Sequence, residues 1–136
     1  MKALIVEGSS TMRSVLRRIL SMRKFEVIEA QDNLSAMNIA QGEQAINLAL
    51  VEWNPREIHA LEFIAQIRQN AASNATIILM ADVEPAAREL HAALLAGADN
   101  YLMIPFTSQE IDERLVHAGF RGRMLSGSDR TGLTCR

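Results

Sequence analysis

Five short runs rich in apolar residues alternate with five stretches of helical periodicity, and this alternation limits the folds open to the chain. Each run is four to six residues long and lies between turn-forming or capping residues, as is typical of buried strands. Repeated strand–helix units favour a parallel sheet with right-handed crossovers and helices on both faces. We therefore predict an α/β fold with strands over residues 3–6, 25–30, 48–52, 76–81 and 101–104, the second nearer a sheet edge because it carries acids.

The helical stretches are placed by capping residues and by apolar spacing. The first is predicted over residues 11–23, capped by Ser9 or Ser10. Its core-facing stripe follows the spacing i, i+3, i+4, i+7 and i+8: Met12, Val15, Leu16, Ile19 and Leu20. Its basic residues lie mostly off that stripe: Arg13, Arg17, Arg18, Arg23 and Lys24. The later helices are predicted over residues 32–41, 61–70, 85–96 and 107–117, with Gly42, Pro85 and Gly97 marking ends.

The composition is that of a soluble globular protein. A length of 136 residues fits one domain, and the net charge of −2 gives no general attraction to nucleic acid or anionic membranes. The single cysteine, Cys135, cannot form an internal disulfide, which favours a reducing compartment. No apolar run approaches the roughly 18–20 residues needed to cross a bilayer. We therefore expect a cytoplasmic protein with no membrane partner.

The end of the chain differs from the rest in composition. Glycine and serine crowd residues 119–136, and the apolar periodicity disappears there. We predict a domain over residues 1–118, followed by a flexible tail or linker over residues 119–136.

The third predicted strand ends in an acid. Its apolar run stops at Glu52, and open parallel sheets place ligands and reacting groups at the carboxyl ends of their strands. Glu7 follows the first strand and Asp82 follows the fourth, so three carboxylates are expected near one edge. Close carboxylates raise the pKa of at least one of them unless a cation joins them. The alternatives are a weak Ca²⁺ or Mg²⁺ site and a solvated acidic cleft.

Several short motifs occur at a spacing that matches a known family. They are Ser10-Thr11-Met12-Arg13, Glu52-Trp53-Asn54, Leu61-Glu62-Phe63, Ile67-Arg68, Gly97-Ala98-Asp99-Asn100-Tyr101-Leu102 and Pro105-Phe106. Together they resemble the CheY-like receiver domain of bacterial response regulators, over roughly residues 2–118. The resemblance implies a flavodoxin-like, doubly wound sheet of five parallel strands in the order 2-1-3-4-5, with five helices.

The resemblance also implies a phosphorylation site, from which this chain departs. The family uses two adjacent acids for Mg²⁺, an aspartate as phosphoacceptor, a Thr or Ser, and a Lys. The corresponding residues here are Glu7, Gly8, Glu52, Asp82 and Ile104. Mg²⁺ needs near-ideal octahedral geometry, and phosphoryl transfer needs charge neutralisation. We therefore predict little or no phosphotransfer, no enzymatic activity and no cofactor.

The function that follows is that of a degenerate receiver, a phosphorylation-independent interaction module in a two-component-type pathway. Two alternatives concern Glu52, which would be either a working phosphoacceptor or a mimic of phosphoaspartate that holds the active arrangement. A third alternative is a cyclic-dinucleotide-binding module that uses Arg13, Arg17 and Arg18, since guanidinium groups pair well with phosphate.

The resemblance implies an interaction and switch face on the fourth helix, fifth strand and fifth helix. We place Leu90, Leu94, Tyr101 and Ile111 on it. The expected partner is a signalling protein or output domain, or a second copy of the chain in a homodimer through this face. Contact with nucleic acid is expected only through an attached or separate output domain.

Overall fold

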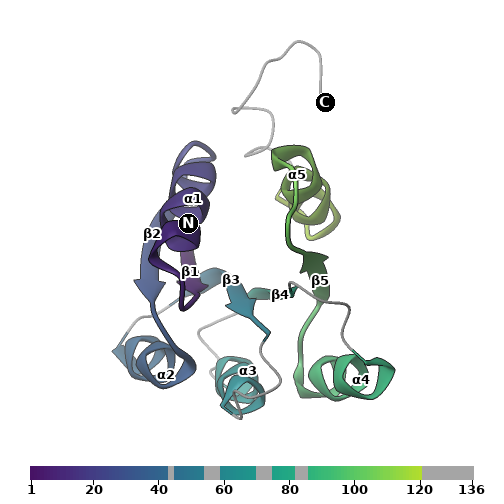
Figure 1. Ribbon diagram of the computed structural model, residues 1–136. Helices are drawn as coiled ribbons and strands as arrows, with labels where there is room; N and C mark the ends of the chain where they lie inside the picture. The colour runs from purple at the N-terminus through teal and green to yellow at the C-terminus, as the bar shows by residue number, and fades with distance from the viewer. Residues whose placement is uncertain (43–44, 54–58, 70–74, 82–85, 121–136) are drawn as a thin grey trace.

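Five parallel strands form a single sheet. The computed structural model describes residues 1–42, 45–53, 59–69, 75–81 and 86–120. The strands are β1 (Lys2–Val6), β2 (Glu26–Ala30), β3 (Ile46–Glu52), β4 (Thr76–Ala81) and β5 (Asn100–Met103). Their order is β2-β1-β3-β4-β5, with every pair parallel (Figure 1). Both the predicted order and the edge position of β2 are confirmed.

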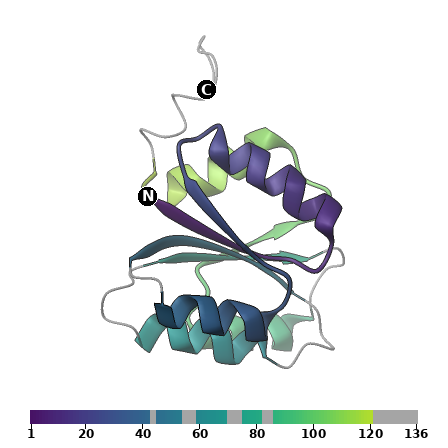
Figure 2. The same cartoon turned by 90° about the vertical axis from the view of Figure 1, so that its left-hand side faces the viewer.

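Helices cover both faces of the sheet. They are α1 (Ser10–Ser21), α2 (Asn33–Gly42), α3 (Ala60–Gln69), α4 (Ala87–Ala96) and α5 (Ser108–His117). Helices α1 and α5 lie on one face, and α2, α3 and α4 lie on the other (Figures 1 and 2). The predicted α/β, doubly wound fold is therefore confirmed. In the described ranges, every helix is too short or too polar to cross a membrane.

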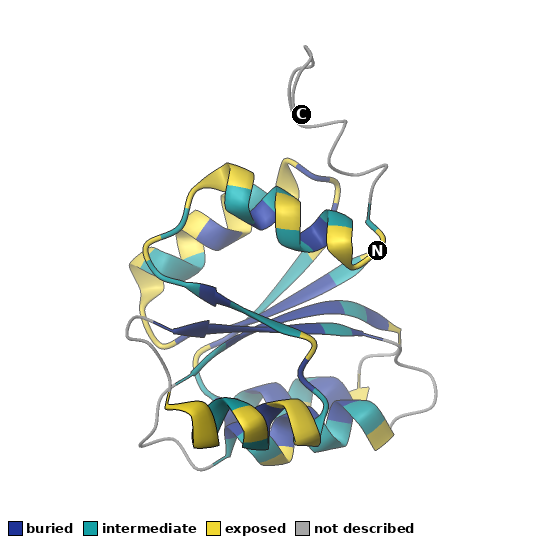
Figure 3. Ribbon diagram, turned by 90° about the vertical axis from the view of Figure 1, so that its right-hand side faces the viewer, coloured by how far each residue is buried: buried dark blue, intermediate teal, exposed yellow. Residues whose placement is uncertain are grey.

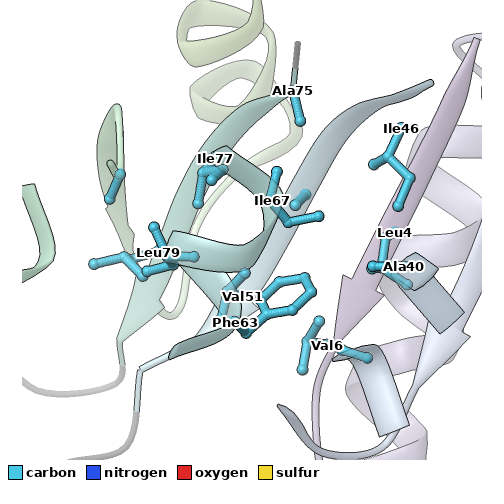
Figure 4. Close-up of a cluster of buried hydrophobic side chains, with 14 of the residues drawn as sticks. Leu4, Val6, Ala40, Ile46, Val51, Phe63, Ile67, Ala75, Ile77 and Leu79 are labelled. Carbon is cyan, nitrogen blue, oxygen red and sulfur yellow. The ribbon is translucent and has the colours of Figure 1, made fainter. Parts of the chain in front are cut away.

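Two apolar cores lie on the two faces of the sheet. The cluster on the α2, α3 and α4 side contains Leu4, Val51 and Phe63 (Figure 4). The cluster on the α1 and α5 side contains Leu16, Leu50 and Leu115. Alternate residues of a strand point to opposite faces, which is why Leu50 and Val51 belong to different clusters. Figure 3 shows buried residues along the strands and exposed ones on the outward sides of the helices.

The ends of several helices carry the expected caps. The Ser9 hydroxyl accepts a hydrogen bond from the Met12 amide at the start of α1. Thr107 caps α5 in a reciprocal pair with Glu110. Gly97 ends α4 with φ +125°, a conformation that favours glycine. The predicted start of this helix at Pro85 lies outside the described residues.

The predicted stripe of α1 needs two corrections. Val15 is 45% exposed, because the helix turns Leu16 and Leu20 toward the sheet and leaves Val15 at the margin. Arg23 is buried at 5% exposed, although we grouped it with residues mostly off the stripe. It lies just past the end of α1, and it is buried because its guanidinium group reaches Asp112 and Ser108 of α5.

The packed chain continues past α5 to Phe120. Its ring stands edge-on to Phe25, with 5.5 Å between the ring centroids, and its amide donates to the Leu115 carbonyl. The predicted tail lies outside the described residues from residue 121 onward.

Candidate functional site

The predicted acids lie at the carboxyl edge of the sheet. Glu7 follows the last residue of β1, and Glu52 is the last residue of β3. These strands are neighbours, with Val6 paired to Val51. Parallel pairing therefore brings Glu7 and Glu52 together, as the sequence predicted. Asp82, the third acid, lies outside the described residues.

Glu7 is a buried acid that lacks full hydrogen bonding. Its side chain is 4% exposed, and its Oε2 accepts a hydrogen bond from the Ser9 amide at 3.1 Å. Its Oε1 is buried and has no hydrogen-bond partner in the described part of the chain. Burial raises the pKa of the Glu7 carboxyl, and the nearby negative charge of Glu52 raises it further.

Glu52 accepts a hydrogen bond from the loop that follows β1. The Gly8 amide donates to Glu52 Oε1 at 3.0 Å. Gly8 does not have a positive φ, and a Cβ added to it would lie 3.5 Å from Glu52 Oε1, an ordinary contact. Gly8 is therefore not required by backbone strain. It supplies a backbone amide to Glu52, at the place where the sequence resemblance predicts the family's second acid.

Arg13 places a guanidinium group against the same loop. Its Nη1 donates to the backbone carbonyls of Glu7 at 2.7 Å and of Gly8 at 3.3 Å. Its Nε lies 3.3 Å from Glu29 Oε1 on β2. We predicted Arg13 only as part of a helix face. The spacing of Arg13 along α1 could not identify these contacts, because one of its partners, Glu29, lies on the neighbouring strand β2.

No described residue supplies a lysine-like cation at the end of β5. Ile104, which the sequence resemblance predicts at the family's lysine position, follows β5, and its side chain packs against the core cluster on the α1 and α5 side. Within the described ranges, no group of three or more His, Cys, Asp or Glu side chains could hold a metal ion. The described part of the site thus contains two carboxyls, two loop amides and one arginine.

The predicted interaction face is only partly present. Leu94 is 48% exposed, and Leu90 and Tyr101 are half-buried. Ile111 was predicted on this face, and that prediction is wrong. Ile111 is 2% exposed, because α5 turns it with Leu115 onto the sheet, on the face opposite α4. The sequence analysis missed Leu95 of α4, which is 75% exposed.

Two arginines of the predicted ligand-binding face have a carboxylate between them. Arg13 and Arg17 both form ion pairs with Glu29 of β2. Arg18, the third residue of this face, is exposed on α1. An anionic ligand would have to displace Glu29 to use the two paired guanidinium groups.

The sequence and fold can be compared with known proteins. A CheY homologue of Campylobacter jejuni is 31% identical over 116 residues, which are 85% of this chain and 89% of the relative. CheY1 of Helicobacter pylori is 32% identical over 116 residues, which are 85% of this chain and 94% of the relative. Chemotaxis proteins are therefore among its similar relatives.

Solved structures match in fold. CheY4 of Vibrio cholerae superposes with a TM-score of 0.75 at 21% identity, covering 85% of this chain and 96% of that protein. A CheY-like receiver domain protein of Methanospirillum hungatei gives 0.76 at 20% identity, with coverage of 90% and 94%. Residues 3–116 match the family described as the response regulator receiver domain. The chain belongs to the family of response regulator receiver domains.

Proposed function

We propose that this receiver domain works as a pseudo-receiver, a non-enzymatic interaction module that signals without being phosphorylated. The observation that carries the proposal is the position of Ile104. It puts an apolar side chain, packed against the core, where a phosphoryl group on Glu52 would need a cation. Glu7 and Glu52 already place two carboxyls close together at the carboxyl edge of the sheet.

Phosphoryl transfer depends on positioning and on neutralising the charge of the transferred group. Glu52 Oε1 accepts a hydrogen bond from the Gly8 amide, and this bond stabilises the charge of the carboxylate and so makes it a weaker nucleophile. The Glu7 carboxyl lies close enough to Glu52 to repel its charge and would repel an incoming phosphoryl group as well. Each effect opposes phosphorylation of Glu52.

Mass spectrometry after incubation with acetyl phosphate and Mg²⁺ tests the proposal. We expect no mass gain in the wild-type chain. A gain of one phosphoryl group that disappears in Glu52→Gln would contradict the proposal and favour the working phosphoacceptor. The matched control restores the family's usual residues through Glu7→Asp, Gly8→Asp, Glu52→Asp, Asp82→Thr and Ile104→Lys. A mass gain in this control would show that the five positions, and not the scaffold, account for the silence.

The exposed side of α4 supports an interaction role. Leu94 and Leu95 are large apolar side chains in contact with solvent, next to half-buried Leu90. Such residues are enriched where a partner covers the surface. We propose a signalling protein, an output domain or a second copy of the chain as the partner of this face, with Tyr101 at its margin.

Sedimentation of the wild type and of Leu94→Ser/Leu95→Ser tests the homodimer. A dimer in the wild type that becomes a monomer in the double variant would assign the contact to α4. A dimer unchanged by the double variant would place the contact elsewhere. A monomeric wild type would leave a different protein as the partner.

The remaining alternatives make distinct predictions. If Glu52 mimicked a phosphoaspartate, Glu52→Gln would weaken partner binding by more than about tenfold, or 1.4 kcal/mol. We expect a smaller change. Cyclic-dinucleotide binding is not favoured because Glu29 already pairs with Arg13 and Arg17. Calorimetry tests this alternative. It would be favoured if the wild type bound a cyclic dinucleotide with micromolar affinity and Arg17→Ala/Arg18→Ala did not.

A further inference from the structure

The loop between β1 and α1 has its backbone groups bonded to side chains. The Gly8 amide donates to Glu52 Oε1 at 3.0 Å, and the Ser9 amide donates to Glu7 Oε2 at 3.1 Å. On the other side, Arg13 Nη1 donates to the carbonyls of Glu7 and Gly8. Amides and carbonyls of one short loop are therefore held by ionisable side chains. Hydrogen bonds to charged groups are stronger than neutral ones.

These bonds connect three neighbouring strands. Glu52 belongs to β3, and the loop continues β1. Arg13 extends the connection to β2 through its ion pair with Glu29, in which both side chains are largely shielded from solvent. The carboxyl ends of β2, β1 and β3 are thus joined by residues of this chain alone.

The Mg²⁺ ion that the family implies does not fit this arrangement. Mg²⁺ keeps several waters and demands near-octahedral oxygen ligands. Glu7 is 4% exposed, which leaves no room for a hydrated ion at its buried oxygen, and Gly8 brings no carboxylate. The Arg13 guanidinium already occupies the loop carbonyls, and its positive charge would repel a divalent cation.

We propose that residues 7–9, Arg13 and Glu52 form a loop brace that holds the β1–α1 loop in one conformation without a metal ion. The proposal rests on the phosphorylation-independent function above and deepens it, because it names what keeps the site at the carboxyl edge of the sheet in place. Within the loop brace, Glu52 is a positioning residue. An aspartate would end about 1.5 Å short, one carbon–carbon bond, and would lose the Gly8 amide.

Amide hydrogen exchange of Gly8, followed by NMR, tests the loop brace directly. The wild type is compared with Glu52→Gln, which keeps the acceptor, and with Glu52→Asp and Glu52→Met, which remove it. We expect slow exchange in the wild type and Glu52→Gln, and exchange about tenfold faster or more in the other two, the scale of one charge-assisted hydrogen bond. Equal Gly8 exchange in the wild type and Glu52→Met would overturn the proposal.

Two internal controls belong to the same spectra. The Ser9 amide belongs to the same loop but is bonded to Glu7, so it should accelerate less than the Gly8 amide in Glu52→Asp and Glu52→Met. The Leu50 amide in the middle of β3 should be unchanged, which shows that the variants are folded. If Ser9 and Leu50 accelerated as much as Gly8, the effect would be general destabilisation, and the specific role of Glu52 would be refuted.

A titration with MgCl₂, matched in ionic strength with NaCl, tests independence from metal. We expect no saturable change in the Gly8 and Ser9 amide shifts of the wild type. A saturable change would overturn the loop brace. The outcome is separable from the phosphorylation test: a phosphoryl mass gain with a Mg²⁺-silent loop would refute only the proposed function. A saturable Mg²⁺ response without a mass gain would refute only the loop brace.

Discussion

Glu7 and Arg23 are buried to nearly the same extent, 4% and 5% exposed, but their surroundings differ. Arg23 follows α1 and reaches α5, where its guanidinium group donates to Asp112 Oδ1 at 2.5 Å and to Ser108 Oγ at 2.6 Å. It also donates to the Ile19 carbonyl at 2.8 Å. Glu7 has one bonded oxygen, one oxygen without a partner in the described chain, and a second acid beside it.

Both side chains lose water on folding, and the cost of this desolvation is compensated much better for Arg23 than for Glu7. An opposite charge and two neutral acceptors offset the desolvation of Arg23, so this residue belongs to the scaffold that fixes α1 against α5. The desolvation of Glu7 is offset by the Ser9 amide and, more weakly, by the charge of Arg13, while Glu52 adds repulsion. The difference teaches that the buried charge of Glu7 does not stabilise the fold, whereas that of Arg23 does. We expect mutations at the two places to change stability in opposite directions.

The largest effect is expected from Asp112→Ala. It leaves the Arg23 guanidinium buried without its counter-charge, which should lower the free energy of unfolding by about 3 kcal/mol. Urea denaturation measures this loss. Glu113→Ala, an exposed neighbour on α5, is the matched control and should stay within about 0.5 kcal/mol of the wild type. A loss below about 1 kcal/mol in Asp112→Ala would mean that the stability of the fold depends as little on the charge partner of Arg23 as on that of Glu7.

Glu7→Gln is expected to change the free energy of unfolding in the opposite direction and to stabilise the fold. The amide keeps an acceptor for Ser9 and removes the repulsion from Glu52, so the free energy of unfolding at neutral pH should rise by about 1 kcal/mol. Chemical denaturation at pH 7 measures the gain. Destabilisation by this variant would place Glu7 with Arg23 among the residues that hold the scaffold.

The pH dependence of the free energy of unfolding tests whether the charge of Glu7 destabilises the fold. Burial keeps the pKa of Glu7 in the folded state above its ordinary value of 4.5, so the folded chain binds this proton more tightly than the unfolded chain. The Glu7 contribution to stability is therefore lost as pH rises from 4.5 through the raised pKa, and it stays constant at higher pH. The stability difference between Glu7→Gln and the wild type should vanish in acid and grow across that window. A difference independent of pH would assign the effect to packing.

The smallest effect is expected from Arg17→Gln. Arg17 also pairs with an acid, Glu29, but the Arg17 side chain is 48% exposed, and exposed ion pairs contribute little. The free energy of unfolding should change by less than about 0.5 kcal/mol. A larger loss in thermal or urea denaturation would show that exposure does not separate this pair from that of Arg23 and Asp112.

Local pattern carried most of the fold prediction. The strand at Thr76–Ala81 was predicted at its observed bounds, and the end of β3 at Glu52 was predicted because the apolar run stops there. The placement of Glu7 near Glu52 also followed from the sequence, since parallel neighbours bring their carboxyl ends to one edge. Periodicity and strand direction are properties of short segments, so sequence alone determined them.

Contacts between segments far apart in the chain needed the tertiary structure. Arg23 is buried because α5 comes to lie beside the end of α1 and supplies Asp112, 89 residues later. Ile111 is buried because α5 packs against the sheet with Ile111 and Leu115 in the core cluster. The Gly8 amide finds Glu52, and Arg13 finds Glu29, only after β1, β2 and β3 are aligned. Whether a charged side chain finds a partner depends on distances of a few ångströms between residues that are far apart in the sequence. The sequence pattern does not contain these distances.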